Sequence, residues 1–382
     1  MNEVKPPPCR GGRGERSVFC VMLSSLKKFT LQVIAGANVA SILAMLLVGY
    51  SDRLNPVEHP ILANAGLAFP AFLFVNMCFL VFWVIFKWKG VLLSLAGFLI
   101  CYSPIQTYFP LNISKDAPSG SIKVLSYNIC QYSGWEGKKQ EHPILLYLQR
   151  QNADIVCLQE ASPDLVGDAN IEAVLGKTYA YRDTARVGSS DVLALYSKYP
   201  IISREHINYE SRYNLSVAFR VKIDNDTVLV INNHFESTGL STNDRSQFKE
   251  LVKGDMQRDS VKQTSRRLVD KLGEASARRA PQAEAVARYI KQHSDESIIL
   301  CGDFNDCPIS YTHYLLADLL TDCYVHTANG PGISYHEGGF YVRIDNIMCS
   351  SDWKPYECKV DNKIKTSDHY PIVCRLKKHG KH

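Results

Sequence analysis

The chain has 382 residues, of which 46% are hydrophobic and 21% are charged, and its formal net charge is +5. This composition excludes a disordered or collagen-like chain, and the length suits two or three domains. The net charge belongs entirely to residues 1–110, because residues 111–382 hold equal numbers of acidic and basic groups. The composition therefore does not indicate a chain-wide surface for nucleic acid or another polyanion.

Residues 1–28 form a basic N-terminal segment, and three long stretches without charge follow it within residues 29–110. Each stretch has the roughly 20 apolar-rich residues that a helix needs to cross a bilayer, although two prolines weaken the third. A buried helical hairpin in a soluble protein is the alternative, but helices that are hydrophobic on all sides favour lipid. We therefore predict three transmembrane helices, with the lipid bilayer as a partner. The stretches are Phe29–Ser51, Ile61–Phe86 and Gly90–Ser114.

Lysine and arginine predict the orientation of these helices. Residues 1–28 hold six of them, the connection 52–60 holds one, and the connection 87–89 holds two. The positive-inside rule therefore places the N-terminus and the second connection in the cytoplasm. Because an odd number of spans exports the rest of the chain, we predict an integral protein of a bacterial inner membrane with a periplasmic or extracellular C-terminal domain.

Residues 111–120 are expected to form a linker, and residues 121–382 a domain in which β-rich runs alternate with amphipathic helices. This alternation is typical of α/β or α+β folds with sheets packed between helices. Helices are expected at 143–151 and 281–293, the latter with Pro281 in its first turn. The expected strands are 123–127, 154–158, 192–196, 217–223, 227–232, 297–301, 343–349 and 372–376.

Residues 240–279 interrupt the alternation and are predicted to be a helical insertion. Between Asp244 and Arg279 there are ten Lys/Arg and six Asp/Glu, and apolar residues recur at helical spacing. One interpretation is a solvated hairpin resting on the domain. The other is a lid or patch that recognises an anionic substrate.

The eight cysteines after residue 110 contain no C-x-x-C pair, so they do not indicate a zinc site. Several lie in apolar strand-like runs, where buried free thiols are expected. Disulfides are permitted in an exported domain but are not required.

Polar side chains that carry chemistry gather at the ends of the predicted strands. Oxygen ligands without Cys or paired His favour Mg²⁺ or Mn²⁺ over zinc. Histidines and carboxylates beside such an ion are suited to phosphoryl hydrolysis. The six segments are Ser126-Tyr127-Asn128-Ile129, Leu158-Gln159-Glu160, Asn232-Asn233-His234-Phe235, Gly302-Asp303-Phe304-Asn305-Asp306, Arg343-Ile344-Asp345-Asn346 and Ser367-Asp368-His369-Tyr370-Pro371.

Taken together and in this order, the six segments resemble the motifs of the endonuclease/exonuclease/phosphatase superfamily, which includes deoxyribonuclease I, neutral sphingomyelinases and inositol-polyphosphate 5-phosphatases. The resemblance covers about residues 121–376 and implies a four-layered α/β (α+β) sandwich with two mixed sheets. It also implies Mg²⁺-dependent or Mn²⁺-dependent hydrolysis of a phosphoester.

The resemblance assigns a role to each residue. Glu160 is the implied main metal ligand, with Asn128 and Asp368 beside it. Asp303 is implied to position or deprotonate the attacking water, and Asn305 to donate to a phosphate oxygen. Asp345 is implied to pair with His369, and His234 to contact phosphate. Arg279 and Gln282 match an Arg-x-x-Gln motif for substrate binding, but they follow His234 at a longer spacing than the family has, because the insertion lies between.

The leading hypothesis is a membrane-anchored, divalent-metal-dependent phosphoesterase that hydrolyses a phosphodiester, of nucleic acid or phospholipid type, outside the cytoplasm. His234 favours a diester. A phosphomonoesterase of the same fold, a non-catalytic binding or signalling module and a small transporter with an appended domain are the alternatives. A linker of up to about 40 Å leads us to expect a catalytic face directed along or away from the bilayer. The oligomeric state is not indicated.

Overall fold

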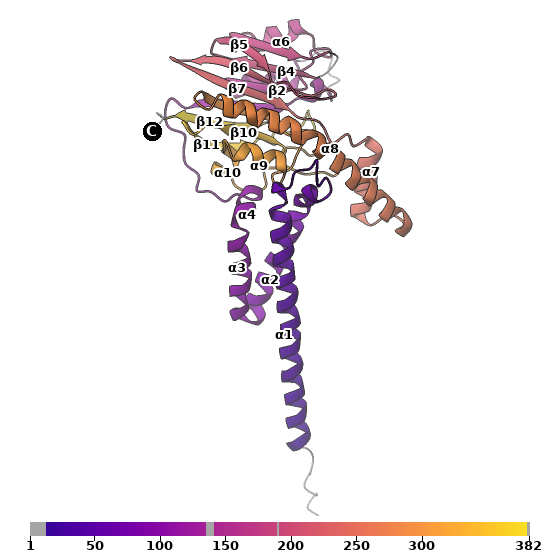
Figure 1. Ribbon diagram of the computed structural model, residues 1–382. Helices are drawn as coiled ribbons and strands as arrows, with labels where there is room; N and C mark the ends of the chain where they lie inside the picture. The colour runs from indigo at the N-terminus through magenta and orange to yellow at the C-terminus, as the bar shows by residue number, and fades with distance from the viewer. Residues whose placement is uncertain (1–12, 135–140, 189–190, 380–382) are drawn as a thin grey trace, which may run out of the picture. The chain divides into compact units, whose positions relative to one another are not determined.

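The computed structural model describes residues 13–134, 141–188 and 191–379 (Figure 1). The chain forms two compact units. The smaller comprises the residues up to Leu47 and Ala71–Cys101, and the larger comprises Val48–Pro70 and Tyr102–His382. The residues that connect the first two apolar helices therefore belong to the larger unit.

The smaller unit is built from apolar helices: most of α1 (Arg13–Gly49), most of α2 (Phe69–Phe86), and α3 (Val91–Ile100). Two helical segments, Met22–Arg53 and Leu62–Phe86, are long and apolar enough to cross a membrane. A third span is present if the bent pair Trp88–Ile100 and Tyr102–Tyr108 counts as one. The three predicted spans thus correspond to two or three suitable helices among the described residues.

A buried polar contact ties the three helices of the smaller unit together. The Asn38 side-chain oxygen of α1 accepts hydrogen bonds from Trp83 Nε1 of α2 at 2.9 Å and from Ser94 Oγ of α3 at 3.1 Å. Polar groups that pair in this way between apolar helices supply the attraction that hydrophobic burial cannot supply in lipid.

The larger unit contains two six-stranded sheets, each with one parallel pair near its centre and antiparallel pairs elsewhere. Inward-facing apolar residues of both sheets form a shared core. The first sheet has the order β11 (Trp353–Val360), β12 (Ile372–Lys378), β1 (Ile122–Asn128), β2 (Ile155–Gln159), β4 (Val192–Ser197), β3 (Tyr181–Arg186). The second has the order β5 (Ile201–His206), β6 (Leu215–Ile223), β7 (Asp226–His234), β8 (Ser297–Asp303), β10 (Asp345–Cys349), β9 (Thr321–Asp322).

Helices cover the outer face of each sheet. Apolar residues of α5 (Pro143–Gln151) and α6 (Asp168–Leu175) pack on the first sheet. The second sheet is covered by α8 (Arg258–Gln292) and α9 (Tyr311–Ala317), and Figure 1 shows α8 running along it. The result is a four-layered sandwich with two mixed sheets, which confirms the predicted fold class.

Helix α8 differs from the prediction. The expected helix began at Pro281, whereas α8 begins at Arg258 and runs through Pro281 without ending. Proline removes one backbone N–H donor from the helix, which usually kinks or breaks it. Here the apolar face beyond it, including Val286 and Ile290, is buried against the second sheet and keeps the helix in place. The segment between His234 and Arg279 thus forms α7 (Thr242–Lys253) and the first part of α8.

The residues between the apolar helices and the first strand lie against the larger unit. Arg343 Nη2 donates to the carbonyl oxygen of Thr107 in α4 (Tyr102–Tyr108) at 2.5 Å. Asn112 Nδ2 donates to the carbonyl oxygens of Val325 and Ala328, in and after α10 (Cys323–Thr327), at 3.0 and 2.6 Å. Asn112, in the predicted linker, therefore contacts the domain.

The described cysteines are free thiols, and those within the two sheets are buried. This agrees with the expectation for apolar strand positions.

Candidate active site

The polar segments predicted from the sequence meet at one edge of the sandwich. Asn128 ends β1 and Glu160 follows β2, while His234 ends β7 and Asp303 ends β8. The carboxyl ends of both parallel pairs, one from each sheet, thus face the same region, where ligands commonly bind in α/β folds. On the antiparallel β10, Asp345 is the register partner of Asp303.

A buried hydrogen bond joins the two sheets beneath this region. Gln159 Nε2 of the first sheet donates to Asn232 Oδ1 of the second at 2.7 Å. Asn232 Nδ2 then donates to the carbonyl oxygens of Leu158 and Ala194 at 3.1 and 3.2 Å. These hydrogen bonds link the two sheets beneath the groups at their ends, although Gln159 Oε1 is buried without a partner among the described residues.

Asp303 lies at the centre of the site and is only 1% exposed. Asn128 Nδ2 donates to its Oδ2 at 3.1 Å, and the Asn305 backbone N–H donates to its Oδ1 at 2.8 Å. Burial raises the pKa of Asp303 to about 6, although the positive charge of His369 opposes the rise. The preceding residue must be glycine, because a Cβ on Gly302 would lie 2.0 Å from the carbonyl oxygen of Asn233.

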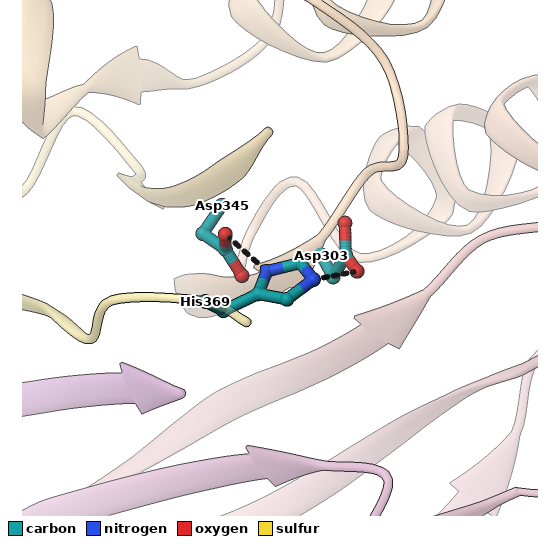
Figure 2. A group of neighbouring side chains, drawn as sticks. All are labelled: Asp303, Asp345 and His369. Atoms are coloured by element: carbon teal, nitrogen blue, oxygen red, sulfur yellow. Dashed lines mark hydrogen bonds and ion pairs between the residues drawn. The ribbon is translucent and has the colours of Figure 1, made fainter. Parts of the chain in front are cut away.

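His369 is paired with Asp345 (Figure 2). Its Nδ1 lies 2.8 Å from Asp345 Oδ2, and its Nε2 lies 3.7 Å from Asp303 Oδ2. Burial lowers the pKa of His369, but the negative charges of Asp345 and Asp303 outweigh that effect and raise the pKa to about 10. The pairing implied by the resemblance is present, and the residues present favour a protonated ring.

His234 is arranged in the same way on the other side of Asp303. Its Nδ1 contacts Asp191 Oδ2, and its Nε2 lies 3.7 Å from Asp303 Oδ2 and 3.9 Å from Glu160 Oε1. Burial lowers the pKa of His234, but the charge of Asp191, followed by those of Asp303 and Glu160, raises it to about 9.

Asp191 was not among the residues predicted from the sequence. It belongs to none of the six segments, but it directly precedes the predicted strand 192–196. That strand, β4, pairs antiparallel with β2, so its first residue lies at the same edge as the residue that ends β2. Strand pairing, rather than a motif, is the signal that could have identified it.

The oxygen donors of the site fit a hard divalent cation. Glu160, Asp303 and Asp368 line one hollow. Asn128, expected beside the metal, instead turns its amide Nδ2 to Glu160 and Asp303, while its Oδ1 accepts from the Cys130 N–H. Asp345 Oδ1 is buried with no hydrogen-bond partner among the described residues, an arrangement that a cation or an ordered water commonly satisfies. Ligand atoms of Asp303, Asp345 and His369 also lie within 4.8 Å of one another. The hydrogen bond between His369 and Asp345 accounts for the closeness of two of these three residues without a metal ion.

Arg279 and Gln282 differ in where the structure places them. Arg279 borders the hollow, but it is 1% exposed and its Nε lies 3.2 Å from Asp306 Oδ2. Gln282 is fully buried, where its Oε1 accepts from the Glu236 N–H and its Nε2 donates to the Glu210 carbonyl. Gln282 therefore lies beneath the loop after β7 and does not reach the hollow.

The remaining wall of the hollow contains residues that the sequence did not identify. The Tyr335 ring lies against the His369 ring, with centroids 5.1 Å apart, and the Arg245 guanidinium lies over Tyr335 at 5.7 Å. Arg245 comes from α7, so the insertion contributes to the site. The other residues that line the hollow, of which Asp306 and Ile344 belong to predicted segments, are Asn64, Leu67, Ser237, Thr238, Gly239, Leu240, Arg245, Leu272, Asp306, Cys307, Tyr335, Phe340, Val342 and Ile344.

Residues 125–369, more than half of the chain, match a family described as the endonuclease/exonuclease/phosphatase family. Residues 31–108 match a second family, described as a domain of unknown function. Among curated protein sequences the comparison found no match.

Solved structures of similar fold include the catalytic domain of human Nocturnin with bound sulfate, which is 17% identical. The match covers 68% of this chain and 95% of that one, with a TM-score of 0.48. An endonuclease/exonuclease/phosphatase from Beutenbergia cavernae is 17% identical over 68% of this chain and 72% of its own, with a TM-score of 0.49. TDP2 from D. rerio, solved with a single-strand DNA product, is 16% identical over 68% and 100%, with a TM-score of 0.48.

Proposed function

The chain belongs to the endonuclease/exonuclease/phosphatase family, and from this we propose that it is a Mg²⁺-dependent phosphodiesterase anchored in a membrane by its N-terminal helices. The arrangement around Asp303 is the main support. Two histidines, each paired with its own carboxylate and each coming from the region of a different sheet, place Nε2 3.7 Å from the same oxygen of Asp303. This symmetry surrounds one reaction centre with a base and two proton donors.

Each group has a chemical task that its surroundings support. The Asp303 carboxylate accepts a proton from an attacking water, and its raised pKa brings its basicity closer to neutral pH. Protonated His369 donates to the non-bridging or leaving oxygen, because Asp345 holds its Nδ1 and leaves Nε2 directed at the centre. His234, held by Asp191, supplies the second positive charge against the phosphate.

A divalent cation held by Glu160 and Asp368, with Asn128 orienting Glu160, would supply Lewis-acid stabilisation of the phosphate charge. Mg²⁺ is favoured over zinc because the donors are carboxylate oxygens.

A diester is favoured over a monoester because a second histidine faces the centre. The membrane location rests on the apolar helices, and export of the catalytic domain rests on the distribution of lysine and arginine. Two reporters attached to the C-terminus test the orientation. A reporter that is active only outside the cytoplasm should be active, and one that is active only in the cytoplasm should be inactive. The reverse pattern would contradict export of the catalytic domain.

The proposal is tested with the full chain purified in detergent and 4-nitrophenyl methyl phosphate as a soluble diester. Hydrolysis is expected with Mg²⁺, to be lost with a chelator and to return when Mg²⁺ is restored. Glu160→Gln, Asp303→Asn and His369→Gln should each lower kcat by about 100-fold or more.

Glu172→Gln is the matched control, since the Glu172 side chain is 63% exposed and lies on α6 away from the site. Near-normal turnover in Asp303→Asn or His369→Gln would contradict the assigned roles. Phosphate release from monoesters with no cleavage of diesters would favour the phosphomonoesterase. Failure of the wild type to hydrolyse either class would favour the binding module.

A further inference from the structure

The hollow that contains the reaction centre is lined mainly by two kinds of side chain. Some are carboxylates and histidines. Others are aliphatic and aromatic side chains contributed by separate parts of the chain. These are Leu67 from η2 (Leu62–Ala68), Leu240 and Leu272 from the insertion, and Phe340 and Val342 from the loop before β10.

Leu67 reaches the hollow because residues 48–70 are docked on the catalytic unit. Asn64 Oδ1 accepts a hydrogen bond from Ser276 Oγ of α8 at 3.0 Å. Gly66 approaches the loop after β8 so closely that a Cβ on it would lie 2.1 Å from the carbonyl oxygen of Ile309. Asn55 Nδ2 also donates to Glu284 Oε1 of α8 at 3.4 Å. The segment that connects two apolar helices is therefore a part of the active-site wall.

The segment that contains Leu67 continues along the chain into an apolar helix. The candidate membrane span Leu62–Phe86 includes Leu67, and α2 begins two residues later at Phe69. Ile61, Leu62 and Leu67 are 55%, 59% and 44% exposed. The other connection, through α4 and Asn112, also contacts the catalytic domain.

The cations near the hollow are poorly suited to a nucleic-acid strand. Arg279 is ion-paired with Asp306, and Arg267 and Lys271 are ion-paired with Asp244. Of the basic residues that line the hollow, Arg245 is the one for which the described residues offer no ion pair, and it lies over Tyr335. A polynucleotide needs a groove of unpaired cations with stacking rings, whereas leucine side chains suit an aliphatic chain.

We infer that the substrate is a phosphoester of a membrane amphiphile, whose phosphate reaches Asp303 while its aliphatic chain lies along Leu67, Leu240 and Leu272. The inference rests on the proposed function and names its substrate class. Leu67 and the insertion are then specificity determinants.

The test compares two diesters that share one leaving group, 4-nitrophenyl methyl phosphate and 4-nitrophenyl dodecyl phosphate, the latter below its micelle concentration. The full chain in detergent with Mg²⁺ should give a kcat/KM at least about 10-fold higher for the dodecyl ester. Leu67→Gln and Leu272→Gln, made separately, should each lower the dodecyl-to-methyl ratio by about 10-fold. Leu67→Met should keep the ratio, because it keeps an apolar side chain of similar volume.

Leu62→Gln is the control, since Leu62 belongs to the same short helix but does not line the hollow. It should leave the ratio unchanged, which separates contact in the site from general partition into detergent. Thermal unfolding of each variant separates loss of contact from loss of folding.

A wild-type ratio near one, or equal effects of Leu67→Gln and Leu62→Gln, would overturn the inference while leaving the phosphodiesterase proposal intact. Higher kcat/KM for a single-stranded oligodeoxynucleotide than for the dodecyl ester would overturn it in favour of nucleic acid. Absence of hydrolysis of every ester by the wild type would overturn both proposals.

Discussion

The docking of residues 48–70 on the catalytic unit can be tested with the single substitution Gly66→Ala. A Cβ at this position would lie 2.1 Å from the carbonyl oxygen of Ile309, 2.7 Å from its Cγ2 and 2.9 Å from its Cβ. The closest contact is with backbone, which cannot rotate away as a side chain would. Either η2 or the loop after β8 must move by about 1 Å to restore an ordinary contact.

The size of the effect follows from this crowding. Insertion of one methyl group into a tightly packed contact costs about 1–3 kcal/mol. For a unit of this size that corresponds to a fall in Tm of roughly 2–10 °C. Because Asn64 and Leu67 flank Gly66 and line the hollow, the same shift should lower kcat/KM for the dodecyl ester more than for the methyl ester.

The assay is thermal unfolding of the full chain in detergent, followed by tryptophan fluorescence, with hydrolysis measured in parallel. Gly36→Ala in α1 is the matched control, because nothing lies within 4 Å of the added Cβ. It should leave Tm unchanged or raise it, since alanine favours helix. A Gly66→Ala protein with the Tm and the ester preference of the wild type would refute the docking of residues 48–70 against Ile309.

Three further predictions concern other contacts. Asp191→Asn should lower kcat by about 100-fold, because His234 loses the charge that favours its protonated form, and a kcat pH profile checks this. Ser241→Ala removes the N-terminal cap of α7 and should cost about 1 kcal/mol of helix stability, measured as faster amide exchange in α7. Burial raises the pKa of Asp322, but hydrogen bonding to His313 outweighs this effect and lowers the pKa. The stability that this pair contributes is therefore present above about pH 4 and is lost on further acidification. Between pH 7 and pH 3 the Tm of Asp322→Asn should fall less than the Tm of the wild type.

The central strands were predictable because burial on both faces gives them a simple sequence pattern. All seven residues of β8 are buried, and the run Ser297–Cys301 was recognised as a strand. The edge strand β5 was missed, because four consecutive residues, Ile202–Glu205, are exposed and mix apolar with charged types. Edge strands depend on their pairing partner more than on their own pattern.

The candidate site residues also differ in how far the sequence could predict their positions. The structure brings Asp303, Asp345 and His369 together, and each lies in one of the six segments singled out in the sequence. Gln282 also lies in a motif, but a motif does not fix which way a side chain of a helix faces, and this one faces a buried loop. Asp191 lies in no motif, and its position depends on how β4 pairs with β2.

Leu67 could not be assigned to the site from the sequence. It lies 93 residues before Glu160, in a stretch whose only recognisable pattern is its apolar composition. Its role arises from tertiary packing of η2 on α8 and on the loop after β8, which no local pattern encodes.

The place of β12 has a consequence for truncated chains. This strand lies between β11 and β1 in the first sheet, and His369 lies three residues before its start at Ile372. A chain truncated before His369 would lack both the histidine and the strand that pairs with β1, so we expect such a chain to be inactive and its first sheet to be incomplete.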